Sequence, residues 1–250
     1  MKFAIGLETI RRPDGTDYFG QTLANLTRAG VFKSELLSTF RVAHGEGFTR
    51  QQNGQRAIAM AAADVNADWV IKLEDDLDFV DNFLENVATW LEDFGHANTC
   101  LFSLGASFET VSHSRFCDNE VLTEPGPSFP TVREYLRRGE HCVPHRVGGY
   151  WGAQALVMRR ADALDLATFL GPDPALWDGV MHHKNRGHDL MLQCWGSARG
   201  VRSFACTVPS FVQHIGRVSN LSQPELQHVQ PFFEFPWPGH KYEYIRRSER

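Results

Sequence analysis

Short apolar runs alternate with amphipathic segments over the first 104 residues of this chain. An unbroken apolar run of about four to eight residues is typical of a buried strand. Between the runs, apolar side chains recur at helical spacing, as Phe19, Leu23 and Leu26 do before Gly30 ends the pattern. Strands are predicted at residues 2–9, 34–40, 69–73 and 99–104, and helices in the segments before Gly30, at 51–63 and at 81–94.

The second half of the chain begins with residues 105–148, which contain four prolines and little periodicity. So long an irregular stretch inside a compact domain is usually functional. Strands follow at 154–158 and 203–208, and helices at 160–170 and 190–199. Because strands and helices alternate, the pattern predicts an α/β fold with three layers and a largely parallel central sheet. No linker or repeat divides the chain, so we expect a single domain over residues 1–250.

Composition narrows the classes of protein that this chain could be. The chain has 250 residues, a formal charge of -5 and 42% hydrophobic residues, which suffices for a core and gives no overall attraction to nucleic acid. No apolar stretch is long enough to span a membrane, and Glu8 interrupts the N-terminus too early for a secretory signal. Five scattered cysteines without a Cys-x-x-Cys pair favour free thiols in a reducing compartment. We therefore expect a cytoplasmic protein.

Three consecutive acids, Glu74, Asp75 and Asp76, follow the predicted strand at residues 69–73. Adjacent carboxylates repel one another and lose hydration when buried, so they persist more easily around a cation. Oxygen ligands suit Mg²⁺ or Mn²⁺, and ligands of open α/β sheets bind beyond the carboxyl ends of the strands. The alternative is a solvated acidic turn that begins the next helix.

Four other segments carry residues that fit the same site. Thr9 and Arg11 follow the first strand, where a nucleotide would be gripped. The turn at residues 148–154 contains Gly149 and Trp151, and an aromatic face there suits the apolar face of a sugar ring. Asp189 opens a helix, and His214 follows the last strand. Simpler interpretations are a helix cap for Asp189 and a hydrogen-bonded histidine for His214.

With these segments in view, the chain resembles the GT-A glycosyltransferases over roughly residues 2–219. Glu74-Asp75-Asp76 is similar to the Glu-Asp-Asp variant of their Asp-x-Asp motif, and residues 209–216 are similar to their Pro-Ser-x-x-Gln-His-x-Gly segment. The resemblance implies a GT-A type three-layer α/β/α sandwich that binds a nucleotide sugar in residues 1–104. Residues 105–250 would then form the acceptor-binding half and the tail, of which 105–148 and the tail after Leu221 cannot be aligned with the family.

The resemblance also implies roles for single residues. Asp76 and His214 would bind Mn²⁺ or Mg²⁺, and the histidine nitrogen favours Mn²⁺ slightly. Asp75 would contact the ribose or a metal-bound water, and Thr9, Arg11, Gly149 and Trp151 would help to bind the nucleotide sugar. Sugar transfer leaves charge on a diphosphate, which a cation stabilises. An inverting transfer also needs a carboxylate to accept the acceptor's proton, and Asp189 is the candidate.

Other functions remain open at this point. A metal-dependent nucleotidyltransferase or phosphohydrolase would also place acids at a strand end, although a two-metal enzyme needs a second acid pair. A non-catalytic module that binds sugar nucleotides would keep the same motifs. The donor is expected to be a UDP-sugar, the family's commonest choice. The acceptor could be a glycan, a protein, a small molecule or a hydroxymethylated base in DNA.

Overall fold

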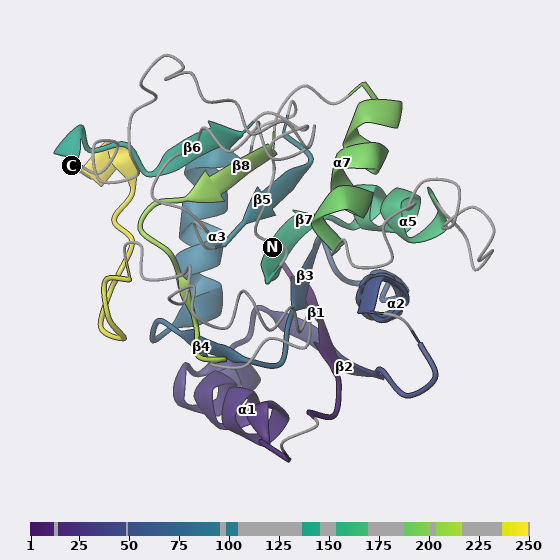
Figure 1. Ribbon diagram of the computed structural model, residues 1–250. Helices are drawn as coiled ribbons and strands as arrows, with labels where there is room; N and C mark the ends of the chain where they lie inside the picture. Colours follow the sequence, from purple (N-terminus) through teal and green to yellow (C-terminus); the bar gives the residue numbers. More distant parts are fainter. Residues whose placement is uncertain are drawn as a thin grey trace, which may run out of the picture.

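The fold is a three-layer α/β/α sandwich, seen in a computed structural model of the chain (Figure 1). The structure describes residues 1–12, 15–48, 50–95, 99–104, 137–145, 154–169, 188–200, 204–216 and 237–249. Two faces of one central sheet are covered by helices, as the alternation of strands and helices predicts. The predicted α/β class is therefore confirmed.

The central sheet has seven strands within the described residues, in the order β2-β1-β3-β7-β5-β8-β6. β1, β2, β3, β5 and β8 share one direction, while β7 and β6 run against their neighbours. The strands are β1 (Phe3–Thr9), β2 (Leu37–His44), β3 (Trp69–Leu73), β5 (Leu101–Ser103), β6 (Cys142–His145), β7 (Ala155–Arg159) and β8 (Phe204–Thr207). The expectation of a mostly parallel sheet is met.

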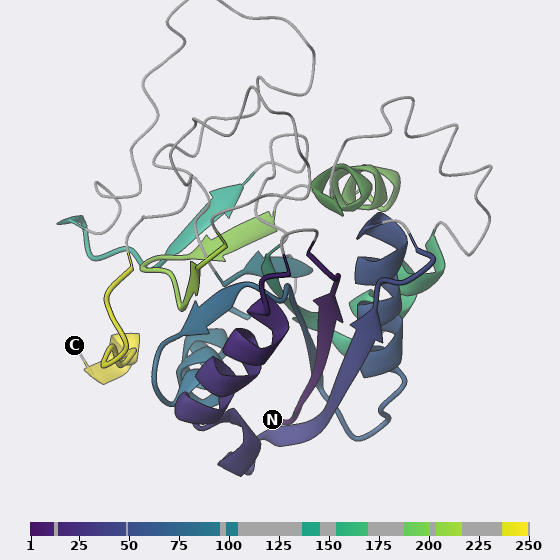
Figure 2. The same ribbon diagram turned by 60° about the horizontal axis from the view of Figure 1, so that its bottom comes forward.

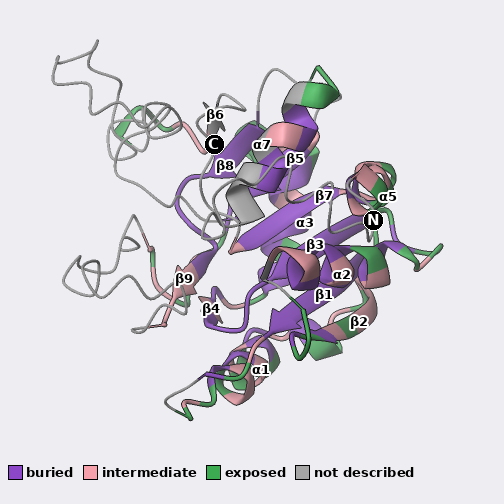
Figure 3. Ribbon diagram, turned by 45° about the vertical axis from the view of Figure 1, so that its right-hand side comes forward, coloured by how far each residue is buried: buried purple, intermediate pink, exposed green. Residues whose placement is uncertain are grey.

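Helices cover the sheet in two groups, which Figure 2 shows on opposite sides of it. The helices are α1 (Tyr18–Arg28), α2 (Arg50–Ala62), α3 (Phe83–Phe94), α5 (Arg160–Phe169) and α7 (His188–Ala198), with short 3₁₀ turns at Val31–Lys33 and Arg247–Glu249. α1 and α3 pack on one face and α2, α5 and α7 on the other, each over its own apolar cluster. Residues of β1 and β3 are buried on both faces, which explains their continuous apolar runs (Figure 3).

The sequence prediction misses three short strands and misplaces another. β4 (Leu77–Phe79) and β9 (Val212–His214) pair as a separate two-stranded sheet, and β6 lies within the segment expected to be irregular. The strand expected at 34–40 is β2 at Leu37–His44, because residues 31–33 form a 3₁₀ turn first. β2 lies at the sheet edge and is mostly half-exposed, so its apolar pattern is weak.

The C-terminal segment 237–249 packs against α3. The Tyr244 backbone N–H donates to Asn86 Oδ1 (2.5 Å), and the Tyr244 hydroxyl donates to Asp93 Oδ2 (2.8 Å). The same Asp93 oxygen accepts the backbone N–H of Arg247 (2.8 Å). Tyr244 is 4% exposed, so this segment completes the core on that face. No helix in the described parts of the chain is both long and apolar enough to cross a membrane.

A glycine in β1 allows α2 to lie directly on the sheet. A Cβ atom at Gly6 would clash with the backbone carbonyl of Ala57. We therefore predict that Gly6→Ala lowers the free energy of unfolding by about 1–3 kcal/mol, because the backbone of α2 must move away. Urea denaturation measures the loss, and Ala59→Ser on the exposed side of α2 serves as the control, with a change within about 0.5 kcal/mol. Equal stability of the two variants would contradict this packing.

Candidate metal centre

The acid triplet lies at the carboxyl end of β3, near the middle of the sheet. Glu74, Asp75 and Asp76 are 5%, 4% and 3% exposed, so they do not form a solvated turn. The Glu74 backbone N–H donates to the Gln154 carbonyl (2.8 Å), which extends the pairing of β3 with β7 beyond the strand. The triplet is thus held rigidly where the parallel strands end, the usual place of a ligand in this class of fold.

Asp75 faces the end of β1. Its Oδ2 atom accepts the Thr9 hydroxyl (2.7 Å) and the Ile10 backbone N–H (3.0 Å), while its Oδ1 accepts Arg12 Nη2 (2.8 Å). Burial raises the pKa of Asp75 above its ordinary value, although Arg12, Ile10 and Thr9 each lower it. Asp75 therefore joins β1 to β3 at the site, and its ionised form depends on these three donors.

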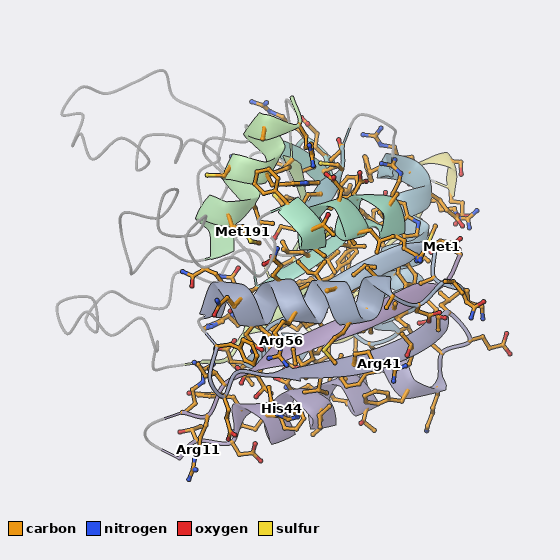
Figure 4. The ribbon with its side chains drawn as sticks, turned by 90° about the vertical axis from the view of Figure 1, so that its right-hand side faces the viewer. Met1, Arg11, Arg41, His44, Arg56 and Met191 are labelled. Carbon is orange, nitrogen blue, oxygen red and sulfur yellow. The ribbon has the colours of Figure 1, made fainter. Side chains whose placement is uncertain are left out.

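Arg12 is the arginine that contacts the acids. Its Nη2 atom bridges Asp75 Oδ1 (2.8 Å) and Asp76 Oδ2 (2.9 Å), and its guanidinium lies over the Tyr18 ring (5.1 Å). Arg11, to which the family resemblance gives a role in nucleotide binding, is exposed and lies at the edge of the molecule (Figure 4). Neighbouring residues in a loop point in different directions, and no periodic pattern distinguishes them. Only the structure shows which arginine is buried beside the two carboxylates.

Asp76 meets His214 although the two are far apart in the sequence. His214 Nε2 lies 3.0 Å from Asp76 Oδ2. The two-stranded sheet creates this contact, because Leu77 of β4 pairs with His214 of β9 and the Ile215 backbone N–H donates to the Asp76 carbonyl (2.8 Å). The acid motif and the Gln-His-Ile-Gly segment therefore form one site.

Gly216 leaves room for this contact. A Cβ atom at Gly216 would lie 2.5 Å from Asp76 Oδ2 and 2.9 Å from His214 Cε1. Both distances are too short for a carbon atom, so any larger residue would displace one of the two side chains. The segment therefore needs a glycine two residues after His214 for steric reasons.

Glu74, Asp76 and His214 could hold one metal ion. Each offers a ligand atom, and the three atoms lie within 4.8 Å of one another. Asp76 Oδ1 is buried and has no hydrogen-bond partner among the described residues, so it is available to a cation. Two carboxylates and an imidazole suit Mn²⁺ or Mg²⁺ with water and substrate in the other positions. The residues therefore fit a divalent cation, and Glu74 is a third candidate ligand beside the predicted Asp76 and His214.

Lys72 and Glu8 extend the charged cluster from the acid triplet along the face of the sheet that α2 covers. Lys72 Nζ is fully buried, pairs with Glu8 Oε1 and lies 3.4 Å from Glu74 Oε1. In the sequence, Lys72 interrupts an apolar strand and gives no sign of its partners. The structure shows that β1 and β3 each contribute a charged residue to the face covered by α2.

Thr22 of α1 fixes the backbone of the acid turn from the other face. Its hydroxyl donates to the Asp75 carbonyl (2.8 Å) and accepts the Leu77 backbone N–H (3.0 Å). Asn25, one turn later on the same helix, donates to the Leu77 carbonyl (3.1 Å). The residues that flank Asp76 in sequence are therefore held by hydrogen bonds from one helix, and both bonds of Thr22 are buried.

The remaining predicted site residues are described only in part. Asp189 belongs to the first turn of α7, as the sequence predicts, and its side chain lies outside the described atoms. Gly149 and Trp151 lie outside the described residues.

Comparison with known proteins gives weak likenesses. No protein-family model matches the chain, and no curated protein sequence matches it. One similar structure is a glycosyltransferase involved in the glycosylation of the major capsid of PBCV-1, with 12% sequence identity and a TM-score of 0.36. The match covers 67% of this chain and 64% of the other chain, so this chain spans less than two thirds of that protein's length. Another is mouse xyloside xylosyltransferase 1, at 8% identity and 0.39, over 81% and 84%. A third is CMP:2-keto-3-deoxy-manno-octonic acid synthetase complexed with CTP, at 12% and 0.43, over 84% and 92%. Likenesses this distant say nothing of activity.

We predict that the Thr22 hydroxyl is needed for both stability and metal binding. Thr22→Val keeps the shape but leaves a buried N–H and carbonyl without a partner, so the free energy of unfolding should fall by about 1–3 kcal/mol. The acid turn should loosen, and Mn²⁺ affinity, measured by calorimetry, should fall about 10-fold or more.

Two variants serve as controls for this prediction. Thr22→Ser restores the hydroxyl and should recover the affinity. Thr207 Oγ1 is buried with no hydrogen-bond partner among the described residues, so Thr207→Val should leave Mn²⁺ binding unchanged. If Thr22→Val bound Mn²⁺ as tightly as Thr22→Ser, the hydroxyl would have no role in shaping the site.

Proposed function

We propose that this protein is a metal-dependent glycosyltransferase of the GT-A type, which moves a sugar from a nucleotide diphosphate sugar to a hydroxyl acceptor with inversion. The observation that carries the proposal is the meeting of Asp76 with His214 at the carboxyl end of β3. These residues come from the two sequence segments on which the family resemblance rests. The segments are far apart in the sequence, so the sequence alone does not predict a contact between them.

The metal would be held by Glu74, Asp76 and His214. When bound, the cation supplies positive charge beside the diphosphate, which becomes more negative as the sugar leaves. Arg12, a second positive group at the same carboxylates, holds Asp75 and Asp76 in place. Asp75 is fully engaged by Thr9, Ile10 and Arg12, so we assign it to the shape of the nucleotide site rather than to the metal.

The donor would lie beside the ends of β1 and β2, which are joined tightly. Asn53 of α2 donates to the carbonyls of Thr9 and Ala43 (both 3.1 Å), and the Gly45 backbone N–H donates to Thr9 as well (2.8 Å). We propose that Thr9 and Arg11, two residues later, line the nucleotide side, with a uridine carrier as the first choice. In this proposal residues 1–104 bind the donor and residues 105–250 the acceptor.

The acceptor side would be built by α7 and by the segment that leads into β7. Gln154 accepts the Glu74 backbone N–H, so β7 starts directly beside the acid triplet. Trp151 is three residues earlier in the chain, a span of roughly 11 Å at most, and Gly149 is close to it in sequence. We propose that Gly149 and Trp151 contact the sugar of the nucleotide-sugar donor. We also propose that Asp189 accepts the proton of the acceptor hydroxyl that attacks this sugar.

The proposal predicts that nucleotide binding requires the metal. In a thermal-shift screen of nucleotide sugars, a UDP-sugar should stabilise the protein with Mn²⁺ and not with EDTA, because a ligand that binds only the folded state raises its stability. Asp76→Asn and His214→Ala should each weaken Mn²⁺ binding about 10- to 100-fold, as lost ligands or their close partners do. His240→Ala, at an exposed histidine on the C-terminal segment, is the matched control.

The same screen, combined with assays of sugar transfer, hydrolysis and pyrophosphate release, separates the competing functions. Equal nucleotide affinity with EDTA, in wild type and Asp76→Asn alike, would exclude a metal-dependent donor site. Stabilisation by CTP or another triphosphate, with release of pyrophosphate, would point to a nucleotidyltransferase. Binding of a nucleotide sugar without transfer or hydrolysis would identify a binding module.

Asp189 provides a separate prediction about the mechanism. Asp189→Asn keeps the size of the side chain but accepts a proton poorly, so the chemical step should slow by about 10²–10⁴-fold while donor affinity stays nearly constant. Single-turnover transfer and calorimetry with the donor measure the two effects. A product with the same anomeric configuration as the donor, or near-normal turnover of the variant, would refute this role.

A further inference from the structure

Arg12 keeps one buried hydrogen-bond donor without an acceptor among the described residues. Its side chain is 7% exposed, and its Nη2 atom donates to Asp75 and Asp76. The Nε atom of the same guanidinium is also buried and has no partner there. An unpaired N–H of a buried charged group is unfavourable, and nearly all such donors in native proteins have an acceptor. The Nε atom of Arg12 therefore indicates a ligand that supplies one.

The geometry of the guanidinium shows on which side this acceptor belongs. Nε and Nη2 form one edge of the planar group, and this edge fits an acceptor that has two oxygen atoms. Arg199 shows the pairing in the same chain, because its Nε and Nη2 atoms donate to the two oxygens of Asp165, both at 2.8 Å. In Arg12 only Nη2 of this edge is engaged, and it faces the acid triplet. The missing acceptor therefore belongs beside the triplet.

Asp76, the partner of Arg12 in one ion pair, has an unpaired atom of the opposite kind. Arg12 Nη2 lies 2.9 Å from Asp76 Oδ2, while Asp76 Oδ1 is buried and accepts no hydrogen bond from a described residue. A cation would satisfy Asp76 Oδ1, and an anionic oxygen would satisfy Arg12 Nε. A divalent cation bound to a diphosphate provides both groups at once.

We propose that Arg12 binds the diphosphate of the nucleotide sugar through its Nε atom. This inference rests on the proposed metal-dependent function and deepens it, since it gives the diphosphate a contact on the protein besides the metal. Nη2 keeps its bonds to Asp75 and Asp76, so one side chain holds both the acids and the phosphate. Arginine stays protonated in proteins, so the contact depends on no titration of Arg12.

Calorimetry with Arg12→Lys tests the proposal. Lysine keeps a positive charge beside Asp75 and Asp76 but lacks the Nε–H edge. With Mn²⁺ present, affinity for UDP and for inorganic pyrophosphate should fall by the same factor, about 10- to 100-fold, because both ligands contain the diphosphate. Affinity for Mn²⁺ alone should fall far less. Arg199→Lys is the matched control, because it removes the same edge from Asp165 of α5 and should leave all three affinities unchanged.

The outcomes of this comparison are distinct. Equal affinities of Arg12→Lys and wild type for both diphosphates would overturn the proposal, and so would a loss for UDP without a loss for pyrophosphate. A loss of affinity for Mn²⁺ alone that is as large as the loss for the diphosphates would also overturn it, because Arg12 would then act only through the metal ligands. A similar loss in Arg199→Lys would show that the effect is not specific to Arg12.

If Arg12→Lys does not fold, the wild-type protein still decides. In nitrogen–proton correlation spectra, the Nε–H signal of Arg12 should shift further with Mg²⁺ and pyrophosphate than with Mg²⁺ alone, and an equal response would overturn the proposal. A wild-type protein that binds neither UDP nor pyrophosphate in the presence of Mn²⁺ would instead refute the proposed function. Wild-type binding of UDP with no loss in Arg12→Lys would remove only the role of Arg12.

Discussion

Charge removed from water is the constraint on which the rest of this structure depends. Three carboxylates end β3 with almost no exposure to solvent, and each must find a donor or a cation. β1 supplies Thr9 and the loop after it supplies Arg12, while β9 supplies His214. The strand order, the position of α1 and the small second sheet can all be understood as the framework that brings these partners to one point.

The sequence predicts the framework better than the site. Within the described residues, apolar periodicity identifies β1, β3 and the helices α1, α2, α3, α5 and α7, because these elements are buried on defined faces. It fails at β4 and β9, which have three residues each and too few apolar positions to show a period. It also fails to locate β2, whose edge position leaves most residues half-exposed. Since β4 and β9 create the Asp76–His214 contact, the step that assembles the site is the one that periodicity cannot reveal.

Single residues of the site divide in the same way. Asp75, Asp76 and His214 stand out in the sequence, because they belong to the acid triplet and to the Gln-His-Ile-Gly segment. Arg12 and Lys72 cannot, since the direction of a loop arginine and the partners of a strand lysine depend on residues distant in the chain. A buried cation is visible in a sequence only as an interruption of an apolar pattern.

The packing of residues 237–249 on α3 has a consequence for how the chain is made. α3 leaves the ribosome long before Tyr242 and Tyr244 do, and the strand β8 that completes the sheet beside β5 is also synthesised late. Until then the apolar side of α3, including Phe94, lacks its cover. Until residues 237–249 have been made, a nascent chain therefore exposes an apolar face of the kind that chaperones bind.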